Sequence, residues 1–466
     1  MKTIYKQSYV CHTSLKAMLF SLLVCLSGCD SFTEVDLPKS QLTSQAVFQD
    51  YATANAAMAD IYAKLRDTGL LSGTIFGLSA QAGIYTDELD FYEGSSSASF
   101  AFYTNAVLPS NGNVSQFWNN AYNQVYACNV VLSGVEASDF DTPKKAQLKG
   151  EALFIRGLLH FYLLQLFGDI PYVKSTDYKA NSTVSRIPLD QVYLQIIEDL
   201  TTAQALLPAS YPTSERVRPN SFAVKAILAR VYLYKGAWED ARQMATVVID
   251  NTSLYGFENE LDKVFLKNSP EAIWQFMPSL AGKNTDEGSV FIFDSGTPPQ
   301  VALTESLVGS FTQGDLRKSH WIGVVSDESG TWYYPFKYKE SQYSGTSKEY
   351  SIVLRLSEQY LIRAEARAKL GDLTGAKQDL DKIRNRAGLP GTAAGSKEEL
   401  LEAILEERKK ELFTEYGHRF FDLKRTDQLN TALSVKPGWD TTENLLPIPE
   451  SELALNPNLK PQNPGY

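Results

Sequence analysis

Three acidic residues cluster in the segment YTDELD, residues 85–90. Paired carboxyl groups are the chemistry of glycoside hydrolases, in which one acts as an acid and the other as a base or nucleophile. The same groups also cap loops or accept hydrogen bonds from the hydroxyl groups of a ligand. We favour loop capping or ligand binding for Asp87 and Asp90, and we predict no catalytic residue. A glycoside hydrolase is the less favoured alternative.

Aromatic residues are the second group with a chemical use, since 25 Tyr, 23 Phe and 6 Trp occur among the 466 residues. They are frequent in two segments without a helical pattern, residues 69–110 and residues 259–350. Both segments are longer than ordinary connections, and long loops on a rigid scaffold usually carry function. We therefore expect some of these rings to face water and bind a ligand.

The sequence does not support metal, nucleotide or nucleic-acid chemistry. His160, His320 and His418 stand far apart and lack a metal-binding spacing, so we predict no metal site. No dinucleotide motif, phosphate loop or serine-nucleophile motif occurs, and no cofactor is expected. The net charge of −10 provides no positive field for phosphate groups, which argues against nucleic acid as a partner.

The first thirty residues predict export and lipid attachment. Lys2, Lys6 and Lys16 precede an apolar run, residues 17–26, which is too short to span a bilayer and fits a secretory signal. Small residues then precede Cys29, as in the sites that a lipoprotein signal peptidase cuts. An ordinary signal peptide with a chance cysteine is the alternative. We predict a signal peptide over residues 1–28 and a membrane-attached mature chain that carries lipid on Cys29.

The elements that must position these residues are mainly helices. Apolar residues recur at steps of three and four in residues 144–167, 188–207 and 400–413. Residues 221–250 and 359–386 each have the pattern of a helix, a turn with glycine and a second helix. Three small residues repeat at an offset of 135 positions: Ala229, Gly236 and Ala241 recur as Ala364, Gly371 and Ala376. This spacing is typical of a tetratricopeptide unit, and unrelated helical hairpins are the alternative.

We therefore expect an all-α fold, a tetratricopeptide-repeat helical scaffold with long irregular aromatic-rich loop insertions. No segment after the signal has eighteen consecutive apolar residues, so the body is not expected to span a membrane. One domain, residues 29–466, follows the signal. Its expected parts are an N-terminal helix with ligand loops (29–110), helical repeats (111–258), a loop insertion (259–350), and C-terminal repeats with a closing tail (351–466).

Several segments, taken in order, carry a resemblance to a known family. They are NAAMADIYAKLRD, YTDELDF, FWNNAYNQVYACNVVL, GEALFIRGLLHFYLLQLFGDIPYV, VLRLSEQYLIRAEARAKLGD, LDKIRNRAGLP, ILEERKKELFTEYGHRFFDLKRTD and LLPIPESELALNPNLKPQNPGY. With Cys29 ahead of them, they resemble the SusD/RagB family of outer-membrane nutrient-uptake lipoproteins over almost the whole mature chain. The last segment departs from the family's ending by an extra Pro461 before Gln462.

The resemblance implies a binding protein rather than an enzyme. Members of this family lie as a lid on a TonB-dependent, SusC-like transporter in the outer membrane, capture glycans or less often peptides, and deliver them to the pore. The resemblance thus implies a lipid-anchored, surface-exposed protein with an oligosaccharide ligand and a transporter partner. The alternative is a helical-repeat adaptor that binds only a protein partner or a peptide.

In the family, ligands contact loops rather than repeats, which agrees with the two aromatic segments. An aromatic ring stacks on the C–H face of a sugar, and nearby polar groups orient the hydroxyls. The predicted ligand-binding residues are Asp87, Asp90, Phe91, Tyr92, Asn105, Trp321, Trp332 and Tyr333. Packing of the ring beneath a loop is the alternative for each aromatic residue.

The charged residues near the C-terminus have a structural interpretation. They are Glu406, Glu407, Arg408, Glu411, Arg419, Asp422 and Arg425. Their number and spacing resemble a charged active site, but we expect them to form ion pairs that hold the last helices against their neighbours.

Overall fold

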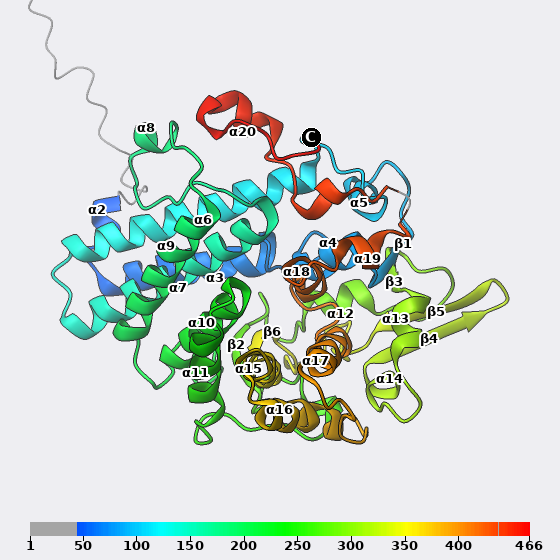
Figure 1. Ribbon diagram of the computed structural model, residues 1–466. Coiled ribbons are helices and arrows are strands. Elements are labelled where there is room, and N and C mark those ends of the chain that lie inside the picture. The colour runs from blue at the N-terminus through cyan, green and yellow to red at the C-terminus, as the bar shows by residue number, and fades with distance from the viewer. Residues whose placement is uncertain (1–43, 437) are drawn as a thin grey trace, which may run out of the picture. The chain divides into compact units, whose positions relative to one another are not determined.

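Helices dominate the part of the chain that the structure describes (Figure 1). This computed structural model describes residues 44–436 and 438–466, so the predicted signal peptide and Cys29 lie outside the described residues. The chain divides into two compact units, Met1–Val47 and Phe48–Tyr466. Helix α2 (Ser44–Val47) is the described part of the first unit, and all other elements belong to the second.

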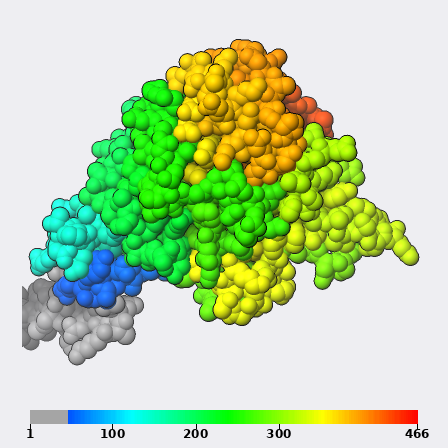
Figure 2. All heavy atoms as spheres, turned by 90° about the horizontal axis from the view of Figure 1, so that it is seen from below, coloured from blue at the N-terminus to red at the C-terminus, as the bar shows by residue number. Residues whose placement is uncertain are grey.

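The second unit is built on a row of helices in which each helix packs against the next. The row consists of α3 (Tyr51–Thr68), α6 (Gly112–Ala137), α7 (Thr142–Phe167), α9 (Leu189–Leu206), α10 (Ser221–Lys235), α11 (Trp238–Ile249), α15 (Leu356–Leu370), α16 (Leu373–Arg386) and α17 (Lys397–Glu411). Helices α11 and α15 are neighbours although the β structure separates them in the sequence. Figure 2 shows the green region of α10 and α11 between the blue and cyan N-terminal helices and the orange C-terminal ones.

Helix α7 lies inside this row and has an extensively buried surface. Every residue from Gly150 to Phe167 is buried, which is typical of a helix that is apolar all round. Its charged side chains have partners, as buried charges require. The Arg156 guanidinium donates two hydrogen bonds of 2.7 Å to the carboxylate of Asp199 in α9. The long apolar run of α7 therefore forms a core against which α6 and α9 pack.

The two segments with repeated small residues are both helical hairpins. Gly236 lies between α10 and α11 and Gly371 between α15 and α16, with φ angles of 77° and 89°. Side chains disfavour this left-handed conformation, so glycine is suited to both turns. The four repeated alanines are completely buried where the helices approach each other: Ala229, Ala241, Ala364 and Ala376. The repeated spacing thus corresponds to one local geometry that occurs twice.

The expectation of an all-α fold with irregular insertions is wrong for residues 259–350. A four-stranded antiparallel sheet has the order β1 (Leu89–Phe91), β3 (Val301–Leu303), β5 (Gly330–Pro335) and β4 (Ile322–Asp327), and β2 (Ala272–Phe276) pairs with β6 (Ser351–Arg355). The cause is local composition. β-branched residues in β4 and aromatic residues in β5 flank the two-residue turn 328–329, a pattern that favours a hairpin.

Short elements complete the second unit. They are α4 (Leu78–Tyr85), α5 (Ala98–Tyr103), α8 (Tyr178–Asn181), η2 (Leu261–Lys263), α12 (Asp286–Phe291), α13 (Glu305–Ser310), α14 (Arg317–His320), α18 (His418–Arg425), α19 (Leu429–Leu433), η3 (Thr441–Asn444), α20 (Glu450–Leu455) and η4 (Pro457–Leu459). Residues 69–110, also expected to be irregular, therefore hold α4, β1 and α5. The short strand β1 joins this early segment to the later β structure, because it pairs with β3.

Buried ion pairs hold the C-terminal helices, as the sequence predicted. Asp422 of α18 accepts hydrogen bonds from Arg408 of α17 and from Arg425, at 2.7 and 2.8 Å. A second group, which we call the Glu411 cluster, joins α17 to three other elements. It consists of Glu411 with Arg317, Arg355 and Arg386. Among the described residues Glu406 makes no ion pair within 4 Å, so the prediction fails for that residue alone of the seven.

Candidate functional site

Some of the predicted ligand-binding residues gather where β1 ends, beside α5 and β5. We call this group the Tyr92 face: Asp90, Tyr92, Tyr103, Trp332 and Lys436. The Tyr103 hydroxyl lies 3.4 Å from Oδ1 of Asp90, and Nζ of Lys436 lies 5.2 Å from the centre of the Tyr103 ring. The Trp332 indole adjoins the Tyr92 phenol and acts to lower its pKa, against the effect of burial. Tyr92 is 38% exposed, so the group combines accessible ring surface with polar groups.

The sheet register decides which aromatic residues can share this face. Leu303 of β3 pairs with Tyr333, and Val301 pairs with Phe91. Successive side chains of a strand point to opposite sides, so Phe91 and Tyr333 lie on the side of the buried Leu303. Asp90 and Trp332 lie on the other side. The predicted pair of Trp332 and Tyr333 therefore cannot form one platform, and only Trp332 belongs to the Tyr92 face.

Partial burial shifts the titration of the polar groups on the Tyr92 face. Burial raises the pKa of Asp90 above its ordinary value, although the Tyr103 hydroxyl and the Lys436 charge act in the opposite direction. Burial lowers the pKa of Lys436 to about 8, while its ammonium donates hydrogen bonds to the carbonyls of Ile84 and Thr86. Burial, followed by the charge of Asp90, raises the pKa of Tyr92. The face thus offers an acceptor and donors in a partly desolvated setting.

Three of the predicted ligand contacts have buried side chains in the structure. Trp321 is 0% exposed, and its indole N–H donates to the carbonyl of Leu261 at 3.0 Å. Asn105 is 1% exposed, and its amide donates to the carbonyl of Tyr85 at 3.1 Å. Phe91 is buried on the core side of the sheet. For Trp321 and Phe91 this burial favours the alternative, in which the ring packs beneath a loop.

The acidic cluster of residues 85–90 is divided among different environments. The Asp87 carboxylate accepts two hydrogen bonds from Arg419, at 2.8 and 2.7 Å. Burial alone raises the pKa of Asp87, but the Arg419 contact outweighs burial and leaves this pKa below its usual value. Glu88 is 2% exposed, and burial raises its pKa to about 8. Asp90 is the member of the cluster that belongs to the Tyr92 face.

Two members of the Tyr92 face were not predicted as ligand contacts. Tyr103 lies in the aromatic segment 69–110, so the sequence marked it as a possible ring for ligand binding. Its position beside Asp90 depends on the packing of α5, which the sequence does not show. Lys436 comes from the C-terminal part of the chain, and no local pattern marks it. A cavity of about 650 Å³ lies elsewhere, between α6, α8 and α20, and no predicted ligand residue lines it.

The described residues offer no evident metal centre and no membrane span. Within residues 44–436 and 438–466, no three His, Cys, Asp or Glu side chains are grouped so that they could hold a metal ion. In the same ranges, no helix combines the length and apolar character needed to cross a bilayer.

Two family descriptions match this chain. The family described as starch-binding and associating with the outer membrane matches residues 38–233, and the SusD family matches residues 310–466. A SusD-like protein, P2, from Formosa agariphila is 26% identical, and the match covers 97% of this chain and 99% of that protein. SusD-like protein P25 of the same organism is 24% identical over 95% of this chain and 96% of its own length.

Solved structures have a similar fold. A SusD superfamily protein from Bacteroides vulgatus has a TM-score of 0.76 at 22% identity, covering 90% of this chain and 100% of that one. A laminarin-binding SusD-like protein has a TM-score of 0.76 at 22% identity, covering 89% and 99% of the two chains. At these identities the structural similarity establishes the fold.

Proposed function

The chain belongs to the SusD/RagB family, and from this premise we propose that it captures oligosaccharides at the cell surface. The matched family description names starch binding and association with the outer membrane, and a protein with a similar fold binds laminarin. In this proposal the chain delivers its ligand to a TonB-dependent, SusC-like transporter without hydrolysing it.

The observation that carries the proposal is the composition of the Tyr92 face. Rings of Tyr92 and Trp332 provide flat surfaces that stack on the C–H face of a sugar, and aromatic side chains lose little conformational entropy on binding. Asp90 accepts hydrogen bonds, and the Tyr103 hydroxyl both donates and accepts them. A ligand that presents one apolar face and a rim of hydroxyl groups matches this arrangement.

The environments of Asp87 and Glu88 support binding without hydrolysis. A glycoside hydrolase needs two carboxyl groups that can both reach the glycosidic bond. Arg419 already occupies both oxygens of Asp87, and Glu88 is buried where its backbone partner is the N–H of Thr414. Neither group is free to act as a paired acid and base in this arrangement.

The helical row and the lipid give this proposal its remaining parts. We interpret the α10–α11 and α15–α16 hairpins as tetratricopeptide units that form a rigid frame for the loops. Lipid on Cys29 would hold the mature chain at the outer membrane, next to its transporter. Substituting Cys29→Ser and fractionating cells tests this part: we expect the protein to leave the membrane fraction, and retention there would contradict lipid anchoring.

Calorimetric titration with oligosaccharides tests the binding function. The mature protein is purified in detergent and titrated with neutral and acidic hexasaccharides. We expect at least one to bind, and we expect Tyr92→Ala and Trp332→Ala each to weaken binding about tenfold. Tyr343→Ala serves as the matched control, because Tyr343 is a 63% exposed tyrosine outside the Tyr92 face. Absence of any glycan binding, with stable co-purification of a transporter, would instead indicate a protein-binding adaptor.

A further inference from the structure

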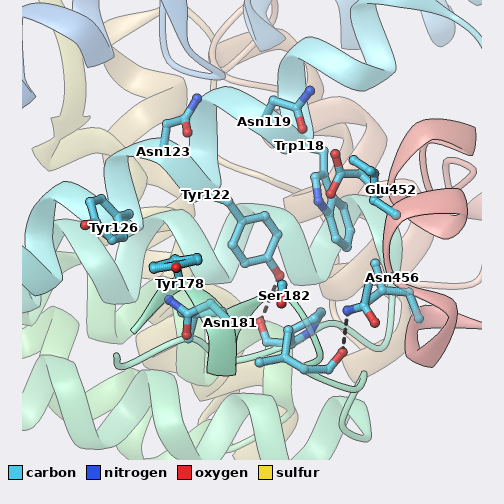
Figure 3. A pocket seen from close by; sticks show the side chains of 15 residues that line it. Trp118, Asn119, Tyr122, Asn123, Tyr126, Tyr178, Asn181, Ser182, Glu452 and Asn456 are labelled. Carbon is cyan, nitrogen blue, oxygen red and sulfur yellow. Dashed lines mark hydrogen bonds between the residues drawn. The ribbon is translucent and has the colours of Figure 1, made fainter. Parts of the chain in front are cut away.

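A cavity between α6, α8 and α20 has the composition of a ligand site (Figure 3). Its volume of about 650 Å³ falls within the range of roughly 300–1,000 Å³ that is usual for sites that bind small molecules. We call it the Tyr122 cavity. The fifteen lining residues are Trp118, Asn119, Tyr122, Asn123, Tyr126, Pro171, Val173, Tyr178, Asn181, Ser182, Val184, Glu452, Leu455, Asn456 and Leu459. None of them belongs to the Tyr92 face.

Helix α6 forms one wall through two parallel rows of side chains. Trp118, Tyr122 and Tyr126 follow one another at steps of four, so they lie along one face of the helix. Asn119 and Asn123 are also four residues apart and lie beside the aromatic row. Figure 3 shows the Tyr122 ring in the middle of the cavity, with Tyr126 on one side and Trp118 on the other. The wall therefore alternates ring surface with amide groups.

The rings differ in exposure in a way that suits a binding surface. Trp118 is 3% exposed and closes the inner end, whereas Tyr126 is 45% exposed at the outer end. The Tyr122 hydroxyl donates to the carbonyl of Pro171 at 2.8 Å, which fixes its ring in place. The side chains of Asn119 and Asn123 make no hydrogen bond to any residue that the structure describes, so both amides remain available for a ligand.

The opposite wall presents a further exposed ring on a fixed segment. Tyr178 of α8 is 73% exposed. The segment around it is held by Asp177, which accepts the backbone N–H groups of Lys179 and Ala180, and by Asn181, which donates to the carbonyl of Ser175 at 2.8 Å. These bonds hold the backbone that carries the ring, so ordering of that backbone costs little entropy on binding.

The third wall comes from the C-terminal part of the chain. Asn456 donates to the carbonyl of Val184 at 2.7 Å and so links this wall to the segment after α8. The Glu452 carboxylate has no hydrogen-bond or ion-pair partner among the described residues, and burial raises its pKa above the ordinary value. One acceptor therefore faces the cavity without a protein partner.

We propose that the Tyr122 cavity binds a segment of a neutral oligosaccharide, as a second site separate from the Tyr92 face. Aromatic rings, free amides and one carboxylate recognise C–H faces and hydroxyl groups. No Lys, Arg or His is among the lining residues, and Glu452 adds negative charge, so the lining suits a neutral glycan better than an acidic one. The nearest cation to the Tyr178 ring is the Lys179 ammonium, 6.0 Å from the ring centre and outside the lining. The free amides also make a purely apolar ligand unfavourable, because each would be desolvated without a partner.

Titration in a background without the first site tests this inference. The double variant Tyr92→Ala with Trp332→Ala is titrated with laminarihexaose, maltohexaose, xylohexaose, mannohexaose and an alginate hexasaccharide. We expect binding of a neutral hexasaccharide to persist and the alginate hexasaccharide not to bind. Adding Tyr126→Ala or Tyr178→Ala is expected to weaken the remaining binding at least tenfold, and adding the control Tyr343→Ala to leave it unchanged.

The outcomes separate this inference from the proposed function. If the intact protein binds a hexasaccharide and the Tyr92–Trp332 double variant binds none, the proposed function stands and the inference falls. If the remaining binding is unaffected by Tyr126→Ala and Tyr178→Ala, the inference falls as well. Binding of the alginate hexasaccharide that is lost with Tyr126→Ala would also overturn it, because the site would then be one for acidic glycans. If only the cavity variants lose binding, the Tyr92 face is the part that is wrong.

Discussion

The Glu411 cluster and the Tyr92 face differ in what their polar groups contact. In the Glu411 cluster a carboxylate on α17 contacts three arginine side chains, and all four side chains are at most 2% exposed. Burial alone would raise the pKa of Glu411, but Arg386, Arg355 and Arg317 hold it well below its usual value. On the Tyr92 face, Asp90 is only half-buried and has a weak contact of 3.4 Å to the Tyr103 hydroxyl.

This difference separates charge that holds the fold from polar groups that remain available. A buried carboxylate surrounded by guanidinium groups is satisfied, and its removal leaves charge without a partner. A half-exposed carboxylate beside rings can exchange its water for ligand hydroxyl groups at little cost. Residue type alone therefore misleads in this chain, because the densest charges are structural and the proposed ligand contacts lie where charges are few.

The largest expected effect is loss of stability on changing the Glu411 cluster. Substituting Glu411→Gln removes a buried charge that three arginines share, although each arginine keeps another carboxylate partner. We expect the free energy of unfolding to fall by about 3 kcal/mol. Urea denaturation followed by circular dichroism measures it. The control Glu406→Gln changes an exposed residue of the same helix, and we expect a change within about 0.5 kcal/mol. Equal effects of the two substitutions would show that the cluster does not hold the fold.

The next largest effect concerns Glu88. Burial raises the pKa of this carboxyl group, whereas the arginines lower the pKa of Glu411. Because the folded-state pKa is raised to about 8 from 4.5, the unfolded chain releases its proton first as pH rises, and stability falls between about pH 4.5 and pH 8. Substituting Glu88→Gln removes this loss.

We expect Glu88→Gln and the unchanged protein to have similar stability at pH 4.5, and the variant to be more stable by about 4 kcal/mol at pH 8. Thermal or urea unfolding at both pH values measures the difference. Glu328→Gln, at an exposed position in the β4–β5 turn, provides the control. A variant that is less stable than the unchanged protein at pH 8 would mean that the Glu88 carboxylate is ionised and satisfied.

On the Tyr92 face we expect a contrast between two neighbours in β5. Trp332→Ala removes a ring beside Tyr92, and we expect oligosaccharide affinity to fall about tenfold, equivalent to about 1.4 kcal/mol. Tyr333→Ala changes the core side of the same strand, so we expect affinity to stay within about twofold while stability falls. Calorimetric titration with the best-binding hexasaccharide measures the affinities. A larger loss of affinity for Tyr333→Ala would reverse our assignment of the two sides.

The smallest expected effect is at Trp321. Substituting Trp321→Phe removes the indole N–H that donates to Leu261, and we expect the free energy of unfolding to fall by about 1 kcal/mol with no change in oligosaccharide affinity. Denaturation and titration of one preparation give both values. Weaker binding at unchanged stability would place Trp321 at a ligand site after all.

The sequence predicted the features that depend on local spacing. The repeated Ala and Gly positions correctly marked two hairpins with left-handed glycine turns, and the acidic and basic residues of α17 and α18 correctly indicated ion pairs. The β4–β5 hairpin was missed because helical periodicity is absent there and the strand signal is short. The sequence does not specify how distant segments pair, such as Leu89 with Leu303. This pairing decides whether each aromatic residue is exposed or buried.

The same limit applies to the Tyr122 cavity. Its aromatic row on α6 is visible in the sequence as residues four apart, which equally fits a helix packed in a core. Only the folded chain shows that Tyr126 and Tyr178 remain exposed and that the C-terminal segment with Glu452 closes one wall. Sites formed by three separate segments thus require the structure, whereas the helices that carry them do not.

A crystal structure of the mature protein soaked with its best-binding hexasaccharide tests the central claim most directly. Our account predicts an intact oligosaccharide with a sugar ring stacked on Tyr92 and Trp332 and a hydroxyl group within hydrogen-bond distance of Asp90. A cleaved sugar beside Asp87 and Glu88, or a crystal in which no bound sugar contacts Tyr92 or Trp332, would contradict it.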